Sequence, residues 1–202
     1  MSQAKRKPGR PATVDTQLAL KQIVELFRSK GYAAVSLDDL SEVTGLSRPS
    51  LYRAFGNKLS MYLGAMDAFG AQVADAAVPE LLAEGEIETV LANFFHAMLR
   101  LYYRDAEITP GCLVFGTAPS SAEEIEVQSR LRFGIEQTDK LMRSRFMQAA
   151  PRCDAAQMTA AVHLASNTQI AFSARAKSGA TQAELENMGT QSARQIARIL
   201  KA

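Results

Sequence analysis

The 202-residue sequence contains no tryptophan, and it has only two cysteines and two histidines. Cys112 and Cys153 show no spacing typical of a zinc site or a disulfide scaffold. The simpler interpretation is that both are small buried or half-buried side chains, and a redox-sensing role is the alternative. Disulfide cross-links are therefore not expected to hold this fold together.

Long apolar segments are also missing from the chain. No run of apolar residues approaches the length of about 18 that a membrane-spanning helix needs. The N-terminus is polar and basic, and it lacks the apolar core of a signal peptide. We therefore expect a cytoplasmic protein that does not interact with membranes.

Residue patterns that support catalysis are absent as well. The sequence has no glycine-rich phosphate loop and no serine elbow, and its two histidines, His96 and His163, lie far apart in the chain. His96 falls on the polar side of a predicted helix, without a second ligand at metal-binding spacing. We expect neither an enzyme nor a metal site nor a cofactor.

Charge is distributed unevenly along the sequence. Residues 1–60 contain ten lysines and arginines against five acidic residues, a net charge of +5. The whole chain has a net charge of +2, so residues 61–202 carry −3. A basic N-terminal part joined to a larger acidic part indicates a nucleic-acid-binding module attached to a domain with a different task.

Residues 35–58, VSLDDLSEVTGLSRPSLYRAFGNK, combine two short helix patterns around one glycine. Ser36 is placed to cap the first helix, and Asp39 follows at the position that completes a capping box. Gly45 ends this helix, because the turn commonly requires a positive φ that glycine adopts without steric cost. Two amphipathic helices joined by glycine also occur in ordinary bundles, but the pattern favours a DNA-binding helix-turn-helix.

The second helix of this region is predicted from Arg48 to about Phe55, with Ser47 as its N-cap and Pro49 in its first turn. At about 100° per residue, Leu51 and Phe55 point into a core, and the opposite side carries no carboxylate. Guanidinium, hydroxyl and phenol groups on that side suit phosphates and base edges. A lysine at the start of the following helix adds a phosphate site. The predicted DNA-binding residues are Ser47, Arg48, Pro49, Ser50, Tyr52, Arg53 and Lys58.

The pattern TG-LS-xx-SLYRAF-GNK resembles the recognition region of TetR-family (AcrR-like) transcriptional regulators. The resemblance extends upstream through a first helix that ends in glycine, and it covers about residues 13–58. This chain departs from the family pattern at Leu40-Ser41, where Ile-Ala is usual, and at Leu59, where an acidic residue is usual. Neither departure affects the outward face of the second helix. The resemblance also implies that Lys58 contacts the DNA backbone.

The expected fold is all-α, with an N-terminal three-helix helix-turn-helix domain followed by a larger helical ligand-binding and dimerisation domain. The predicted parts are a basic flexible arm over residues 1–12, a DNA-binding domain over 13–57 and a helical domain over 58–202. The arm either follows the minor groove or serves as a soluble tail. Further helices are predicted over 87–102, 121–149, 154–177 and 182–201, and residues 109–118 are the least helical.

The second domain contains aromatic, methionine and polar side chains on helices that are expected to surround a cavity. Gly111-Cys112-Leu113 resembles a short motif that lies near the ligand cavity in many TetR-like C-terminal domains. This mixture of apolar and polar side chains predicts a largely apolar effector held by one or two hydrogen bonds. The alternative is that these residues form an ordinary hydrophobic core. The predicted ligand-binding residues are Phe94, Phe95, Met98, Tyr102, Cys112, Phe115, Phe133, Met142, His163 and Asn167.

The last two predicted helices carry stripes that are expected to form a four-helix interface with a symmetry mate. Packing within one chain is the alternative for both stripes. The first stripe is rich in small residues and consists of Met158, Ala161, Val162, Ala165, Gln169, Phe172 and Ala176. The second consists of Leu185, Met188, Ser192, Ile196 and Ile199.

These patterns together predict a homodimeric, ligand-responsive transcriptional repressor. It would bind a palindromic double-stranded DNA operator through the helix-turn-helix, and a small-molecule effector in the C-terminal domain would release it. The alternative is an architectural or regulatory DNA-binding protein that responds to no ligand. That alternative explains the basic N-terminal residues but gives the large second domain no task.

Overall fold

The computed structural model describes residues 15–104 and 109–201, which form an all-helical fold. The predicted fold class is confirmed. The predicted arm over residues 1–12 lies outside the described residues. The helices are α1 (Thr16–Ala34), α2 (Leu37–Thr44), α3 (Arg48–Phe55), α4 (Lys58–Leu82), α5 (Ile87–Tyr102), α6 (Leu113–Thr117), α7 (Ile125–Ala149), α8 (Ala155–Lys177) and α9 (Gln182–Lys201), with a short 3₁₀ turn, η1 (Ala118–Ser121), after α6.

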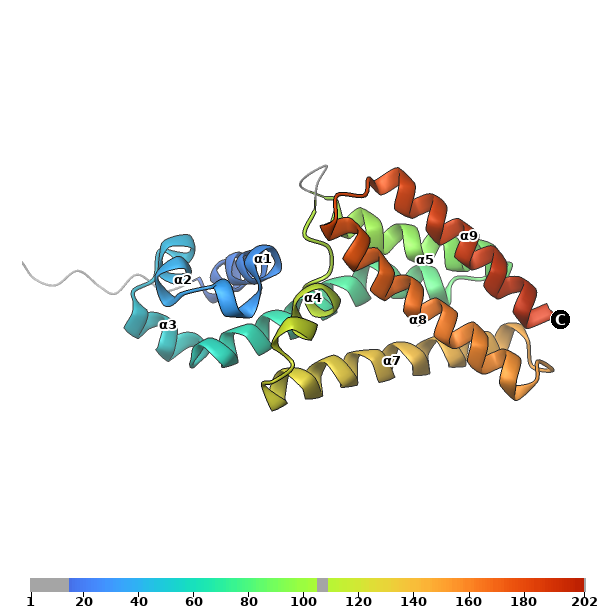
Figure 1. The fold of residues 1–202 in the computed structure, drawn as a ribbon, viewed down its shortest axis with the longest axis horizontal. Coiled ribbons are helices and arrows are strands. Elements are labelled where there is room, and N and C mark those ends of the chain that lie inside the picture. Colours follow the sequence, from blue (N-terminus) through green and yellow to red (C-terminus); the bar gives the residue numbers. More distant parts are fainter. Residues whose placement is uncertain (1–14, 105–108, 202) are drawn as a thin grey trace, which may run out of the picture.

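The molecule is elongated, with the first three helices at one end (Figure 1). Helices α5, α8 and α9 pack together at the other end, and α7 runs along one side of them. The long helix α4 passes from the first group into the second. The same rigid element therefore belongs to both parts of the chain.

Helix α1 begins at Thr16, slightly later than the sequence pattern predicts, because Asp15 is its N-cap. The Asp15 carboxylate accepts hydrogen bonds from the backbone N–H groups of Gln17 and Leu18 at 3.1 and 3.0 Å. Gly31, with φ of 78°, interrupts the helix as predicted, and a last turn continues to Ala34.

The predicted capping signals of the helix-turn-helix are confirmed. The Asp39 N–H donates to the Ser36 hydroxyl at 3.0 Å, and the Ser36 N–H donates to the Asp39 carboxylate at 2.8 Å. Gly45 takes the left-handed conformation with φ of 66°, and Ser47 caps α3. Lys30 hydrogen-bonds to the Asp39 carboxylate at 2.6 Å, and this bond, with those from Ser36, holds the pKa of Asp39 well below its ordinary value.

The core of the N-terminal domain closes on α4 as well as on its own helices. Phe27, Leu40 and Leu51 are fully buried, and Phe55 is half-buried against the same cluster. The Phe27 ring meets the Tyr62 ring of α4 edge-on, with centroids 5.0 Å apart. The helix-turn-helix is thus packed directly onto the helix that continues into the second domain.

Several boundaries in the second domain differ from the sequence predictions. Helix α4 continues through Pro79 to Leu82, whereas the sequence pattern changes at that proline. Residues 109–118 include the short helix α6, although their prolines and glycines predicted little helix. Helix α7 begins at Ile125 rather than at Ser121, because η1 occupies the preceding residues. The predicted spans of α5 and α9 are confirmed.

The small-residue stripe of α8 is part of the intramolecular core rather than an interface. Its members are all buried within one chain, where α8 packs against α6, α7 and α9. Small side chains let these helices approach closely, which is the packing alternative that the sequence left open. Of the stripe on α9, Leu185 and Ile196 are buried, and the remaining members are half-buried.

Phe27→Ala is expected to lower the free energy of unfolding by about 3–5 kcal/mol, because the side chain is fully buried and its removal leaves a cavity. Urea denaturation of the full chain measures this change. Leu18→Ala is the control on the same helix, since Leu18 is 55% exposed, and its effect should stay within about 0.5 kcal/mol. Equal effects from the two substitutions would contradict this core.

Candidate DNA-binding surface and ligand cavity

The outward face of α3 is accessible as the sequence predicts. Leu51 is fully buried, whereas Tyr52 is 46% exposed and Arg53 is exposed. Arg53 makes no ion pair with any residue that the structure describes, so its guanidinium is available to a phosphate or a base edge. Pro49 is also exposed, and Ser50 is half-buried.

Two predicted contact residues of this face already have partners within the chain. Arg48 forms an ion pair with Asp38 of α2, with Nη2 2.5 Å and Nε 3.0 Å from one carboxylate oxygen. The Ser47 hydroxyl accepts from the Ser50 N–H at 3.4 Å and lies 3.0 Å from the Ser50 hydroxyl. The helical wheel of α3 gave no carboxylate on this side, and that was wrong for the folded surface, because Asp38 comes from the neighbouring helix.

Lys58 lies at the first turn of α4, beside the recognition helix. Its ammonium group is 4.6 Å from the centroid of the Tyr32 ring and 3.5 Å from the carbonyl oxygen of Ala33. Asn57 caps the helix by accepting a hydrogen bond from the Ser60 N–H at 2.8 Å. A held ammonium group next to a helix N-terminus suits a phosphate of the DNA backbone.

The second domain contains an apolar cavity of about 460 Å³ between α4, α5 and α7. Seven of the ten predicted ligand-binding residues lie on its wall: Phe94, Met98, Tyr102, Cys112, Phe115, Phe133 and Met142. Phe133 of α7, which lines the cavity, is also 56% exposed. Further lining residues are Met66, Asp67, Phe69, Gly70, Ala71, Val73, Ala74, Val78, Val114, Arg130, Gly134, Gln137, Thr138, Leu141 and Gln169.

Three predicted ligand-binding residues do not lie on the wall of this cavity. Phe95 points to the other side of α5 and packs edge-on against Phe172 of α8, with ring centroids 5.5 Å apart. His163 and Asn167 are exposed on the outer side of α8. Residue type alone did not show which side of each helix faces the cavity.

The wall supplied by α4 was missed as part of the cavity. Met66, Phe69 and Val73 follow one another at helical spacing on this wall, and none of them is among the predicted ligand-binding residues. No sequence signal separates a core stripe from a cavity wall, since both are apolar. The cavity is therefore in contact with α4, and the first turn of α4 lies beside α3, the predicted recognition helix.

Polar groups on the cavity wall are few. Asp67 and Arg130 form an ion pair at 2.7 Å, and both are partly exposed. Burial raises the pKa of the Cys112 thiol, so this cysteine stays protonated and apolar in character, which disfavours the redox alternative for it. The hydroxyl of Tyr102 is buried and has no hydrogen-bond partner among the described residues.

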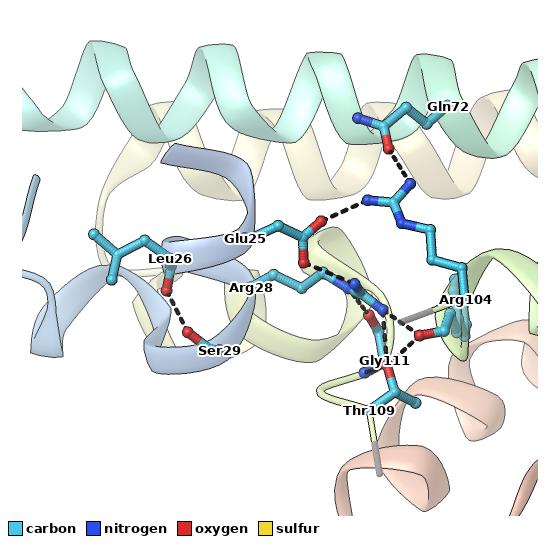
Figure 2. Close-up of polar contacts among 9 residues, drawn as sticks. Glu25, Leu26, Arg28, Ser29, Gln72, Arg104, Thr109 and Gly111 are labelled. Carbon is cyan, nitrogen blue, oxygen red and sulfur yellow. Dashed lines mark hydrogen bonds and ion pairs between the residues drawn. The ribbon is translucent and has the colours of Figure 1, made fainter. Parts of the chain in front are cut away.

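A buried arginine connects the N-terminal domain to the cavity wall (Figure 2). Arg28 of α1 is 3% exposed, and its Nε donates to the carbonyl oxygen of Gly111 at 2.6 Å. Its Nη2 donates to the carbonyl oxygen of Tyr102 and to the Thr109 hydroxyl, both at 2.7 Å. Its remaining nitrogen, Nη1, forms an ion pair with Glu25 at 2.9 Å. The guanidinium also lies 5.3 Å from the centroid of the Phe69 ring on the cavity wall.

The network extends from Arg28 to α4 through two more residues. The other Glu25 oxygen lies 2.7 Å from Arg104, and Arg104 donates to the side-chain oxygen of Gln72 at 2.9 Å (Figure 2). We call the four residues Glu25, Arg28, Gln72 and Arg104 the interdomain network. The sequence did not reveal it, because its members lie far apart in the chain and Arg28 resembles an ordinary helix arginine.

The fold and these two surfaces define a class: a helix-turn-helix DNA-binding protein with a second helical domain. The family profile described as "Bacterial regulatory proteins, tetR family" matches residues 19–65. Over 112 residues the chain is 34% identical to the HTH-type transcriptional repressor ComR of Escherichia coli (strain K12), covering 54% of this chain and 52% of ComR. Over 129 residues it is 30% identical to the uncharacterized HTH-type transcriptional regulator YezE of Bacillus subtilis (strain 168), covering 60% of this chain and 66% of YezE.

Solved structures show that the fold extends over nearly the whole chain. A cysteine mutant of the TetR family transcriptional regulator CifR, complexed with 26-bp operator DNA, superposes with a TM-score of 0.78 at 23% identity and covers 92% of this chain and 98% of that one. AibR in complex with isovaleryl coenzyme A and operator DNA gives a TM-score of 0.67 at 12% identity, with 87% and 95% covered. This chain belongs to the TetR family, whose members are transcriptional regulators rather than enzymes. It spans about half the length of ComR, the repressor to which it was aligned.

Among the described residues, none of the helices is long and apolar enough to cross a membrane.

Arg28→Met is expected to lower the free energy of unfolding by about 3–5 kcal/mol, because it leaves Glu25 and two carbonyl groups without their buried partner. Chemical denaturation of the full chain provides the measurement. Arg132→Met is the control: Arg132 is 82% exposed and pairs with Glu136 on the same helix, so the change should be about 0–1 kcal/mol. A small effect at both sites would show that the interdomain network contributes little to stability.

Proposed function

We propose that this chain is a dimeric transcriptional repressor that a small, largely apolar molecule releases from its operator. One observation carries the proposal: α4 begins beside the recognition helix and also forms a wall of the apolar cavity. A molecule in that cavity therefore contacts the element that supports the DNA-binding surface. Action on chromosomal DNA would place the protein in the cytoplasm.

The DNA-binding half of the proposal depends on the exposed side of α3 and the first turn of α4. Tyr52 and Arg53 are free to enter the major groove, and Lys58 is placed for a backbone phosphate. Arg48 would contact DNA only by sharing or leaving its ion pair with Asp38. The complex of CifR with operator DNA supports this use of the fold.

Two copies are needed to read a palindromic operator, with recognition helices about 34–36 Å apart. The outer side of α8 is the surface that we propose for the dimer. Exposed or half-buried residues on it include Ala160, His163, Leu164, Asn167 and Ala171, and no Asp, Glu, Lys or Arg occurs between Ala155 and Ala174. Depletion of charge is typical of the centre of a protein–protein interface.

Release follows if the cavity and the recognition helices are energetically coupled. Met66, Phe69 and Val73 of α4 face the cavity, so an occupant shifts the population toward conformers in which α4 is tilted differently. Coupling between two such sites is typically about 1–3 kcal/mol, or about 5- to 150-fold in operator affinity. A ligand-independent architectural protein remains the alternative, and it would leave this cavity without a role.

Arg53→Ala is expected to weaken operator binding and to relax base preference at one operator position by about 1–3 kcal/mol, because Arg53 is exposed and makes no ion pair with any described residue. Lys58→Ala should weaken binding to all sequences alike and flatten its salt dependence. Fluorescence anisotropy with the promoter region of its own gene and with single-base variants separates the two. Identical effects on every sequence would show that Arg53 contacts only phosphate.

Gly134→Leu is expected to abolish the response to an effector while operator binding persists. A Cβ at this position meets only Val114, at an ordinary 3.8 Å, so the longer side chain enters the cavity without a backbone clash. Effectors are found by thermal-shift screening, since a ligand that binds only the folded state raises its stability, and are then tested for operator release by gel shift. Sequence-specific binding that no compound weakens would favour the ligand-independent alternative.

A further inference from the structure

We propose that the effector is an uncharged molecule of up to about 18 non-hydrogen atoms with one carbonyl-type oxygen, which accepts a hydrogen bond from the Tyr102 hydroxyl. This inference rests on the proposed function and names the chemical class that the cavity takes. Size, charge and hydrogen bonding each limit that class separately.

The cavity volume limits the size of the molecule. A dry cavity of about 150 Å³ holds benzene, which has six non-hydrogen atoms. The cavity here measures about 460 Å³, and its wall is formed chiefly by apolar side chains such as Phe94, Met98 and Met142. Scaling by volume gives about 18 non-hydrogen atoms, the size of two linked aromatic rings or of a medium-length chain.

The charges around the cavity are already paired, which limits the effector to an uncharged one. Arg130 and Asp67 neutralise each other at 2.7 Å. Arg28 lies behind the wall, and each of its three nitrogens has an acceptor: Gly111, Tyr102, Thr109 or Glu25. A ligand carboxylate or ammonium would lose its hydration without gaining a free counter-ion, which is strongly unfavourable.

The hydroxyl group of Tyr102 is the donor that we expect to bind an oxygen of the effector. The Tyr102 side chain is 2% exposed and lines the cavity, and its hydroxyl has no hydrogen-bond partner among the described residues. Burial first, and the neighbouring Cys112 thiol second, raise the pKa of Tyr102. The thiol is at most a weak hydrogen-bond partner and makes no bond of normal geometry with the hydroxyl. Buried hydroxyl groups nearly always have partners. This hydroxyl is covered by its neighbours, so a ligand acceptor completes the site when the ring turns toward the cavity.

Tyr102 also provides the route from this contact to the DNA-binding domain. Its carbonyl oxygen accepts a hydrogen bond from Arg28 of α1. Tyr102 would therefore bind the ligand through its side chain, and it contacts the N-terminal domain through its backbone. Movement of the ring toward a ligand oxygen therefore acts directly on the interdomain network.

The test uses three probes with one skeleton: benzophenone, diphenylmethane and 4-benzoylbenzoate. Isothermal titration calorimetry on the full chain should show that benzophenone binds about fivefold or more tightly than diphenylmethane, because only the ketone accepts from Tyr102. The carboxylate of 4-benzoylbenzoate should weaken binding relative to benzophenone. Tyr102→Phe should abolish the preference for the ketone and leave the affinity for diphenylmethane unchanged.

Tyr103→Phe is the matched control, because Tyr103 is not on the cavity wall and its hydroxyl donates to the carbonyl of Ala180. This variant should keep the ketone preference. Tyr102→Phe should fold as well as the parent, since it removes only an unpartnered hydroxyl.

Binding of none of the three probes, equal binding of the ketone and the hydrocarbon, or tighter binding of the carboxylate would each overturn this inference. Operator binding, measured on the same preparation without probes, tests the proposed DNA-binding function separately. A chain that binds its operator but shows no ketone preference would refute only the effector class.

Discussion

The burial of the Arg28 guanidinium is the constraint on which the arrangement of the two domains depends. A charge at 3% exposure is tolerated only if each of its donors has an acceptor, and here the acceptors come from α1, from the end of α5 and from the segment before α6. Separating the domains would leave the guanidinium only its Glu25 acceptor, which lies on the same helix, and would remove the three acceptors from the second domain. The contact therefore fixes α1 against the cavity wall more specifically than apolar packing alone would.

Helix α4 makes this constraint relevant to function. Its first turn carries Lys58 beside the recognition helix, and Tyr62 in the next turn meets Phe27. Its middle lines the cavity, and Gln72 joins it to Arg104. A packed helix of this length moves as a unit, because its side chains interlock on both sides. Under the proposed function, a change at the cavity wall would thus be converted into a displacement at the DNA-binding surface rather than absorbed locally.

The sequence predicted those features that are determined by residues close together in the chain. The capping box of Ser36 and Asp39, the left-handed Gly45 and the cap at Ser47 all follow from local chemistry, and the structure confirms them. The cavity was predicted only in part: Phe94 lies on its wall and the adjacent Phe95 does not, because packing against α8 decides which side of α5 faces inward. Residue type is the same at both positions, so no sequence rule distinguishes them.

Polar contacts between different elements of the fold were the features that the sequence could not supply. Asp38 neutralises Arg48 on the proposed DNA surface, and Arg28 reaches Gly111 across much of the chain, yet each looks like an ordinary helix residue in the sequence. These contacts differ in consequence. The exposed pair of Arg48 and Asp38 can open at small cost when a phosphate competes for the guanidinium.

The acceptors of Arg28 also suit the regulation that we propose. Three of them are neutral, namely two backbone carbonyl groups and the Thr109 hydroxyl, and only Glu25 carries a charge. Hydrogen bonds to carbonyl groups depend steeply on distance and angle, whereas attraction between charges changes slowly with distance. A small rotation of the backbone at Tyr102 is therefore enough to weaken the hold on α1. A surface ion pair in the same place would tolerate that rotation and transmit little of it.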